Sequence, residues 1–507
     1  MALVLGVYLQ PFSSIINYFF LGVLIVTATY FLAPVLLRKW ISDKDGNPLP
    51  PGPPIRYAFL RKYAELALHD WQKKYGPVFS IWMGTQLFVV VSDPHIARDL
   101  LVSNGAVFST RKRYFMKNQI ILRGRAITAS PYGDKWRQHR RLATQVLTPK
   151  AMQGFASIMD YESHIFIKSL YKQGQKGKLP VNPAHYAGRF ALNNMLIISF
   201  GMRTDTSEDP LVEKALDLAM EFMDLTGPWS NAVDFFEALQ WLPTPKRSRV
   251  LNSTMVLSRF TEHDPEIREP RQKLDWEDLC MLSAVFTLGG VHSTSGIIQW
   301  FLALIPSHPH IAEKAYEELD RVIGRERWPN AADEPNLPYI RAIIKEVQRV
   351  HAPFWMATPH CTSQDFTYKG TYIPKDTVVV LNCYSLHHNE ERYPDSYVFK
   401  PERYLGDDLG CGESAKLANV MDRDHWTFGA GRRICPGLPA AERELWLAIS
   451  RLLWAYKFEA LPDEPISLDE YEGLSGRTPL PYRLKLVPRI DNLDIVLQAA
   501  DEVKITW

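Results

Sequence analysis

The chain has 507 residues, 46% of them hydrophobic, and its 58 lysines and arginines nearly balance 56 aspartates and glutamates, for a net charge of +2. Neither sign of charge forms a long run, which argues against a nucleic-acid partner. The five cysteines are odd in number and contain no CxxC pair, which argues against a disulfide scaffold and indicates a reducing compartment: Cys280, Cys361, Cys383, Cys411 and Cys435. Length alone permits one large domain or about three.

The first 37 residues carry no charged side chain, and the stretch IINYFFLGVLIVTATYFLAPVLL is long enough to cross a bilayer. It lacks the positive start and the small-residue exit of a cleaved signal peptide. Arg38 and Lys39 follow directly, and by the positive-inside rule they remain in the cytosol. The sequence predicts a membrane anchor over residues 1–39; a buried core helix is the alternative.

The segment PLPPGPP, Pro48 to Pro54, cannot form a helix, because each proline fixes φ and lacks an N–H donor. It predicts a charged and proline-rich linker over residues 40–54 that acts as a stiff spacer. An ordinary loop is the alternative. No repeat or second linker follows, so residues 55–507 are expected to form one catalytic domain.

Strand patterns occur in two places, residues 78–91 and residues 366–381, and each contains a glycine between β-rich runs. Helical patterns dominate elsewhere. In residues 310–324 the side chains of Ile311, Ala315 and Leu319 fall on one face, and Gly324 stands at the position of a C-terminal cap. The expected fold is mostly α with a small β-sheet region.

Near the C-terminus, TFGAGRRICPG (427–437) surrounds Cys435 with glycines at 429, 431 and 437. Glycines let the backbone approach closely, so N–H groups can point at a metal-bound sulfur. Arg433 is near enough in sequence to meet an acidic group above that sulfur. The pattern predicts an iron-binding thiolate.

The chain resembles the cytochrome P450 haem-thiolate monooxygenases, whose F-x-x-G-x-R-x-C-x-G pattern is matched by Phe428, Gly431, Arg433, Cys435 and Gly437. The resemblance covers most of the chain and implies the cytochrome P450 fold with an N-terminal transmembrane helix. It implies haem b as cofactor, with Cys435 as the iron ligand and Arg433, Phe428, Gly429 and Gly437 around it.

Two further motifs support the resemblance. KEVQR places Glu346 and Arg349 three residues apart on one helix face, where they can pair. In the family an arginine from a later segment, here Arg403 of PERY, joins them, which implies a buried charge triad that braces the haem-binding core.

Haem propionates need cationic or N–H donors. Trp136 and Arg140 in YGDKWRQHRRL match the family's W-x-x-x-R arrangement and are expected to reach the propionates. His360 stands where relatives carry an arginine or histidine with the same role.

The segment GGVHST (289–294) departs from the family's distal pattern A/G-G-x-D/E-T-T/S. Gly289 and Gly290 fit it and are expected to open a groove for dioxygen. His292 replaces the acid and Ser293 the threonine, so Ser293, His292 and Thr294 are the candidate catalytic residues for proton supply. The alternative for His292 is a hydrogen bond to a backbone carbonyl.

The family's pocket segments map onto residues 115–122, 220–225, 354–358 and 475–479, which are largely aromatic and aliphatic. This composition indicates a hydrophobic, aromatic or polycyclic substrate. The expected substrate contacts are Phe115, Ile121, Phe222, Gly289, Gly290, Phe354, Trp355, Met356 and Thr478.

No flavin or nicotinamide fingerprint is evident, so the resemblance implies electrons from NADPH–cytochrome P450 reductase, met by basic residues such as Arg137, Arg141 and Arg432. The stretches around residues 424–437 and 474–484 resemble fungal members that tailor indole alkaloids and polyketides. The expected function is an oxygenase in the endoplasmic reticulum membrane, facing the cytosol. The alternatives are a haem-thiolate isomerase, dehydratase or ring-closing enzyme, and a non-catalytic membrane haem protein.

Overall fold

The computed structural model describes residues 21–22, 28, 38–53, 62–227, 230–235, 240 and 274–501. The predicted membrane anchor therefore lies almost wholly outside the described residues. One described helical stretch, Trp276–Ser307, is long and apolar enough to span a bilayer, but most of it is buried inside the protein. It is a core helix, and its apolar surface is covered by other helices.

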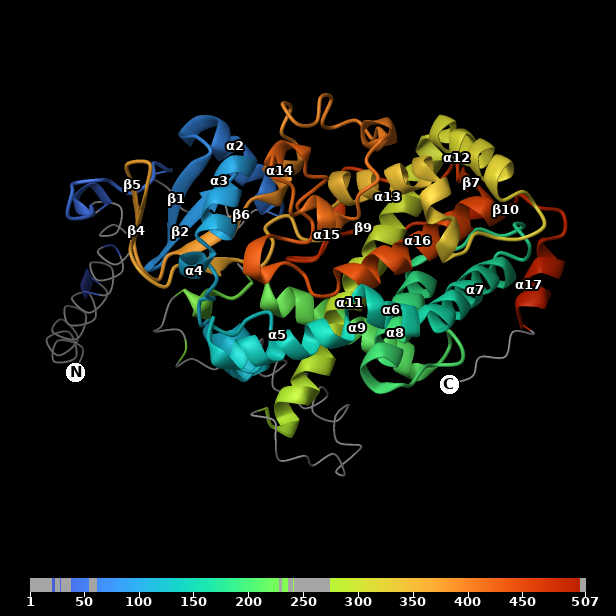
Figure 1. Cartoon of the computed structure of the whole chain (residues 1–507), viewed down its shortest axis with the longest axis horizontal. Coiled ribbons are helices and arrows are strands. Elements are labelled where there is room, and N and C mark those ends of the chain that lie inside the picture. Colours follow the sequence, from blue (N-terminus) through green and yellow to red (C-terminus); the bar gives the residue numbers. More distant parts are fainter. Residues whose placement is uncertain are drawn as a thin grey trace, which may run out of the picture.

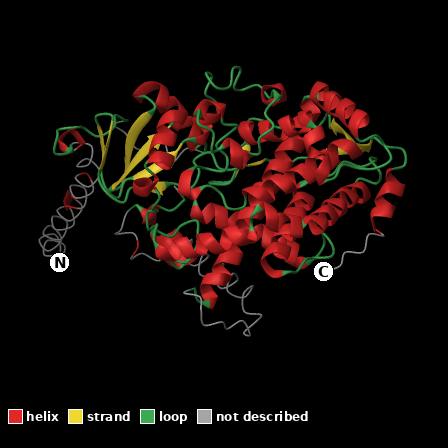
Figure 2. Ribbon diagram, viewed as in Figure 1, coloured by secondary structure: helices red, strands yellow, loops and turns green. Residues whose placement is uncertain are grey.

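Helices make up most of the described chain, and they surround the longest of them, α11 (Figures 1 and 2). The α-helices are α2 (Ala64–Tyr75), α3 (Pro94–Arg98), α4 (Gly105–Phe108), α5 (Asp134–Val146), α6 (Pro149–Gly154), α7 (Ala156–Gln173), α8 (Ala184–Phe200), α9 (Pro210–Thr226), α11 (Trp276–Leu304), α12 (Pro309–Val322), α13 (Pro338–Val350), α14 (Cys383–His387), α15 (Cys411–Ser414), α16 (Leu438–Ala455) and α17 (Leu493–Asp501).

The strands are short and gather at one end of the molecule and near its C-terminal part (Figure 2). They are β1 (Val78–Met83), β2 (Gln86–Val91), β3 (His360–Cys361), β4 (Phe366–Tyr368), β5 (Thr371–Ile373), β6 (Val378–Leu381), β7 (Tyr456–Ala460), β8 (Tyr471–Glu472), β9 (Thr478–Pro479) and β10 (Leu484–Pro488). Both predicted strand regions are confirmed, and so is the mostly helical class.

The largest sheet has the order β1-β2-β6-β3, with β2 and β6 parallel and the other neighbours antiparallel. Its central strands alternate between two cores, as a period of two requires. Val89 and Val91 face the core shared with α3, whereas Phe88 and Val90 face the core shared with α2. Both faces of the sheet are therefore buried.

The helical core is built on α11, which begins with a capping box at Asp275 and packs most extensively against α8. The predicted helix near residues 310–324 is α12, and Gly324 follows it with a φ of +74°. The Gly324 N–H donates to the carbonyl of Leu319 at 3.1 Å, which ends the helix as expected.

The described part of the proline-rich segment is bound to the sheet. The Ser80 N–H donates to the Pro51 carbonyl at 2.7 Å, and the Tyr372 N–H donates to the Pro48 carbonyl at 2.8 Å. Gly52 lies so close to Ser80 that a Cβ there would meet the Ser80 carbonyl oxygen at 1.8 Å. These contacts fix the chain between Arg38 and Gly52 to the body of the protein.

Candidate active site

The loop before α16 wraps its backbone around Cys435. The Cys435 N–H donates to the Phe428 carbonyl at 2.9 Å, which closes the loop. Gly429 and Gly431 have φ values of +72° and +61°, and a Cβ at Gly431 would meet the Leu101 carbonyl oxygen at 2.0 Å. A Cβ at Gly437 would lie 3.8 Å from the Cys435 sulfur. The glycines thus allow the loop to pack against Leu101 and the backbone to approach the thiol.

The Cys435 thiol differs from the other cysteines. Its side chain is exposed, whereas Cys361, Cys383 and Cys411 are buried and Cys280 is half-buried. Burial nevertheless raises the pKa of the Cys435 thiol, while the N–H groups of Gly437 and Leu438 and the charge of Arg140 oppose that rise. A side chain that is accessible yet surrounded by protein faces a space inside the molecule. Backbone N–H groups directed at the sulfur suit a thiolate that binds iron.

Three arginines beside this loop lack acidic partners. Among the described residues Arg111, Arg140 and Arg433 form no ion pair with a carboxylate. Burial, and then the charges of Arg111 and Arg140, lowers the pKa of Arg433 to about 8; burial lowers the pKa of Arg111 to about 9. Buried charges of one sign are unfavourable without a counter-charge. A ligand with two carboxylates, such as haem, would supply that counter-charge, so the residues present fit the group.

The backbone holds these side chains in place. Arg433 donates to the carbonyls of Ser109, Ile127 and Ser130 at 2.8, 3.0 and 2.7 Å. His360 contacts the Phe108 carbonyl through Nδ1 at 2.7 Å. Burial, with the nearby arginines, keeps the pKa of His360 well below its ordinary value, so this ring is neutral.

Trp136 is used differently from the prediction. Its indole N–H donates to the Ile127 carbonyl at 3.1 Å, and the Arg433 guanidinium lies over its ring at 4.2 Å. The N–H is therefore occupied, and the ring supports Arg433. Arg140 follows one turn later on α5, and burial lowers its pKa whereas Cys435 raises it.

Sequence reasoning missed Arg111. It donates to the carbonyls of Thr358 and Pro359 at 2.6 and 2.8 Å and is 8% exposed. The only signal in the sequence was the basic run Arg111 to Arg113, which normally indicates a solvated surface.

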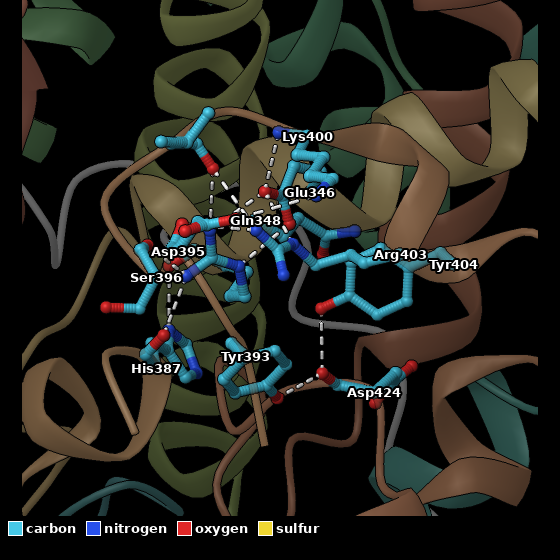
Figure 3. Close-up of polar contacts among 12 residues, drawn as sticks. Glu346, Gln348, His387, Tyr393, Asp395, Ser396, Lys400, Arg403, Tyr404 and Asp424 are labelled. Carbon is cyan, nitrogen blue, oxygen red and sulfur yellow. Dashed lines mark hydrogen bonds and ion pairs between the residues drawn. The ribbon is translucent and has the colours of Figure 1, made fainter. Parts of the chain in front are cut away.

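Glu346 forms ion pairs with both Arg349 and Arg403, and Figure 3 labels Glu346 and Arg403 in this cluster. Arg349 forms two hydrogen bonds to the Glu346 carboxylate at 2.7 and 2.8 Å, and Arg403 adds a third at 3.0 Å. Glu346 and Arg349 are fully buried. Arg349 also donates to the carbonyls of His387 and Ser396, both at 2.7 Å. Removing one member would leave an uncompensated buried charge, at a cost of about 3–5 kcal/mol.

The three candidate catalytic residues on α11 lie on different faces. Ser293 is half-buried and its hydroxyl donates to the Gly289 carbonyl at 2.8 Å. His292 packs against Gly476, where a Cβ would meet its ring at 2.2 Å, and its buried Nδ1 has no hydrogen-bond partner in the part of the chain that the structure describes. Burial lowers the pKa of His292 to about 4, so the ring is uncharged near neutral pH. Thr294 is buried and faces Glu444.

The two glycines of α11 also have different surroundings. A Cβ at Gly289 would meet nothing within 4 Å, whereas a Cβ at Gly290 would meet the Met195 sulfur at 2.4 Å. Gly290 therefore permits close packing of α8 against α11, which corrects the expectation that both glycines open a groove. Gly289 alone faces open space.

The predicted substrate contacts separate into groups. Phe115, Ile121 and Phe222 share one core with α5 and α11. A Cβ at Gly296 would lie 3.4 Å from Thr478, which places Thr478 beside α11. The ring centres of Phe354 and His292 are 6.3 Å apart.

Trp355 and Met356 point elsewhere. Trp355 packs with Trp426 and Ala430, whereas Met356 packs with Phe79 and the sheet. Residues 354–357 form a turn, in which the Ala357 N–H donates to the Phe354 carbonyl at 3.2 Å, and the side chains of Trp355 and Met356 leave it towards different cores. Phe354 is the member of this segment that lies beside α11.

Sequence reasoning also missed Glu444 on α16. It is fully buried, and neither carboxyl oxygen has a hydrogen-bond partner of ordinary geometry among the described residues. Burial raises the pKa of Glu444 to about 8, although the nearby Thr294 hydroxyl opposes this. Glu444 lies on α16, nine residues after Cys435, and its carboxyl group is next to Thr294 of α11. It therefore lies where α16 packs against α11.

Comparisons with known proteins agree with this geometry. The family model described as Cytochrome P450 matches residues 48–275 and 254–486. The chain is 31% identical over 501 residues to cytochrome P450 monooxygenase polD of Polytolypa hystricis, covering 92% of this chain and 94% of that protein. It is 30% identical over 463 residues to cytochrome P450 monooxygenase verL of Clonostachys rogersoniana, covering 85% and 84%. It is 29% identical over 504 residues to cytochrome P450 monooxygenase virE of Hypocrea virens, covering 91% and 90%.

Proposed function

This chain belongs to the cytochrome P450 family and is a monooxygenase, and from that membership we propose that it oxidises a hydrophobic, aromatic or polycyclic secondary metabolite. Its cofactor is haem b, bound through the Cys435 thiolate. Dioxygen is the oxidant, and electrons come from NADPH through cytochrome P450 reductase. The observation that carries the proposal is the exposed Cys435 thiol beside three arginines that form no ion pair with a described carboxylate.

The chain's own residues have distinct tasks in this proposal. Cys435 binds the iron, and the N–H groups of Gly437 and Leu438 stabilise its negative charge. Arg111, Arg140 and Arg433 bind the two carboxylates of the cofactor. When bound, the haem activates dioxygen, and its thiolate ligand favours O–O cleavage.

Ser293 holds a proton at its Oγ beside the open space at Gly289. A hydroxyl in that place could hold and pass on a proton, as the resemblance implies for the distal helix. His292 is neutral and packed against Gly476, so its contribution is to shape the wall of the pocket near Phe354. A neutral residue in the usual position of an acid also keeps the isomerase or dehydratase alternative open to test.

The remaining parts of the chain fit a microsomal enzyme. We assign residues 1–39 to a single-pass anchor in the endoplasmic reticulum membrane, residues 40–54 to a linker and residues 55–507 to a cytosolic catalytic domain. Arg137 and Arg432 both lie over the ring of Tyr132, at 5.5 and 5.2 Å. With exposed Arg141 they form a basic surface for an acidic reductase.

The test is the ferrous–carbon monoxide spectrum of Cys435→Ser. We expect loss of the red-shifted Soret band typical of thiolate ligation, because serine cannot supply that ligand. Cys361→Ser is the matched control, since this cysteine is buried in the sheet and its thiol lies 3.7 Å from the Thr362 carbonyl. A red-shifted band in Cys435→Ser would mean that another cysteine binds iron.

The reaction class has a separate assay. Candidate substrates are incubated with reductase and NADPH, and product, NADPH and oxygen consumption are measured. An oxygenase should form product only while it consumes both NADPH and oxygen. Turnover without NADPH and dioxygen would replace this proposal with the isomerase alternative.

A further inference from the structure

Three buried side chains lie close together near the thiolate loop, the segment of residues 427–437 that carries Cys435. Cys411 lies at the start of α15, and Asp424 and His425 lie in the segment that leads into residues 427–437. Their exposed fractions are 4%, 1% and 1%. One ligand atom from each lies within 4.8 Å of the others, and the Cys411 sulfur is 3.6 Å from His425 Nε2.

The distance between sulfur and nitrogen matches the edge of a zinc tetrahedron. With a Zn–S bond of about 2.3 Å, a Zn–N bond of about 2.0–2.1 Å and a tetrahedral angle, the two ligand atoms are about 3.5–3.6 Å apart. A thiol donating to an imidazole has a similar distance, so the neighbouring groups must distinguish the two arrangements.

The neighbours leave an acceptor unused. Asp424 Oδ2 is buried without a hydrogen bond of ordinary geometry among the described residues, and so is His425 Nδ1. The Cys411 thiol lies beside both Asp424 and His425 Nε2, and its one proton cannot serve both acceptors. Lys345 Nζ is 3.9 Å from Asp424 Oδ2, but it donates to Asp407 and to the Leu409 carbonyl, both at 2.7 Å. A buried acceptor without a donor is unfavourable, and a cation would satisfy it.

The charges around the cluster also favour a cation. Glu442 accepts the Cys411 N–H at 2.6 Å, which brings a second carboxylate to the thiol. The first is the carboxylate of Asp424, which has an oxygen within 4.8 Å of the Cys411 sulfur.

We propose that Cys411, Asp424 and His425 bind one Zn²⁺ ion in a structural site separate from the haem. The ligands are the Cys411 sulfur, the Asp424 carboxylate and His425 Nε2, and water completes the coordination. On binding, the Cys411 S–H bond breaks, an S–Zn bond forms and the proton leaves to solvent, with no change of oxidation state. The ion enters beside Gly410 and Gly412, which are half-buried.

The site would join two parts of the chain that hold the thiolate loop. The hydroxyl of Tyr404 donates to the Asp424 carbonyl at 2.8 Å, and Tyr393 donates to the same oxygen (Figure 3). His425 lies three residues before Phe428, whose carbonyl accepts the Cys435 N–H. A metal there would fix the start of that loop.

The experiment measures zinc and iron in the full-length holoprotein, purified without a histidine tag and equilibrated with zinc chloride before dialysis. We expect about one zinc per chain besides the haem iron. Zinc X-ray absorption should show one sulfur neighbour at about 2.3 Å and nitrogen or oxygen neighbours at about 2.0–2.1 Å.

Cys411→Ser and Asp424→Asn should bind zinc about 10-fold or more weakly, because each removes a ligand. Cys383→Ser is the matched control: it is a buried cysteine whose sulfur lies 3.7 Å from the Trp426 carbonyl and outside the cluster. The ferrous–carbon monoxide spectrum reports whether each variant still folds.

Should the ligand variants fail to fold, wild-type protein decides the matter. Treatment with a zinc chelator should lower its melting temperature, and added zinc should restore it. Wild-type protein without zinc, zinc without a sulfur neighbour, or equal zinc in folded Cys411→Ser would each overturn the proposal and leave a thiol–imidazole hydrogen bond. Failure of the Cys435→Ser test would not affect it.

Discussion

The hydroxyl of Ser293 faces the open side of α11, while the neighbouring His292 and Thr294 face other elements. In the proposed mechanism, proton supply from this helix therefore depends on the Ser293 side chain alone. The Ser293 hydroxyl now donates to a carbonyl one turn earlier, and rotation about χ1 would release it for a ligand.

Removing that hydroxyl should uncouple the enzyme. In Ser293→Ala we expect less product and more hydrogen peroxide per NADPH, because general acid–base help is worth about 10²- to 10⁴-fold. Product, NADPH and peroxide are measured together. Ser295→Ala is the control, since Ser295 makes the same kind of hydrogen bond, to Val291 at 2.6 Å, but is buried. Unchanged coupling in Ser293→Ala would assign proton supply to water or substrate.

Glu444 should make stability fall as pH rises. Burial raises its pKa from 4.5 to about 8, so between these values the folded chain holds a proton that the unfolded chain releases. Stability is greatest below the lower value and decreases towards the upper one, by about 1.4 kcal/mol for each unit of pKa shift.

In Glu444→Gln we therefore expect a flatter stability profile between about pH 5 and pH 8. Urea denaturation at several pH values measures it. Glu459→Gln, at an exposed position of β7, should keep the wild-type slope. A wild-type slope in Glu444→Gln would mean that other groups cause the pH dependence.

At the scale of elements, α8 and α11 touch because Gly290 has no side chain. Gly289, one residue earlier on the same helix, faces open space. Two adjacent glycines of one helix are therefore assigned different roles: Gly290 allows close packing of α8, and Gly289 leaves space beside the proposed site.

Gly290→Ala should destabilise the protein by about 1–3 kcal/mol, because its Cβ would meet Met195. Gly289→Ala should instead gain up to about 1 kcal/mol from helix propensity, but lose activity as the open space narrows. Thermal unfolding and turnover are measured for both. Adding Met195→Ala to Gly290→Ala should cost less than the sum of the two single changes. Equal effects of the two glycine variants would contradict this assignment.

Sequence reasoning succeeded where spacing fixes geometry. Glu346 and Arg349 pair because residues three apart share a helix face, and both strand regions were visible as β-rich runs on either side of a glycine. It could not find Arg111 or Glu444, because their burial results from packing between distant segments. The contact between Met195 and Gly290 also results from packing between distant segments. No local sequence pattern therefore distinguishes Gly290 from Gly289.

At the scale of the whole molecule, the segment from Arg38 to Gly52 is hydrogen-bonded to strands of the catalytic domain. The Arg38 guanidinium donates to the Ser80 hydroxyl at 2.8 Å, and Pro48 and Pro51 accept backbone N–H groups. The predicted linker is therefore partly a structural strap.

A chain that begins at Arg38 should keep its ferrous–carbon monoxide spectrum and melting temperature, and should bind microsomal membranes more weakly. A chain that begins at Pro54 should melt at a lower temperature, because it loses the hydrogen bonds to Ser80 and Tyr372. Spectra, melting curves and membrane sedimentation measure these effects. Loss of haem from the chain that begins at Arg38 would show that the first 37 residues contribute to the core.

The unneutralised arginines also bear on how much of this protein a cell can maintain. A ligand that binds only the folded chain stabilises it by RT ln(1 + [L]/Kd). In the proposed site, haem would also remove the repulsion among Arg111, Arg140 and Arg433. Folded protein made without haem would keep that repulsion and unfold more readily. We therefore expect the cellular amount of this protein to fall when haem is scarce, even at constant transcription.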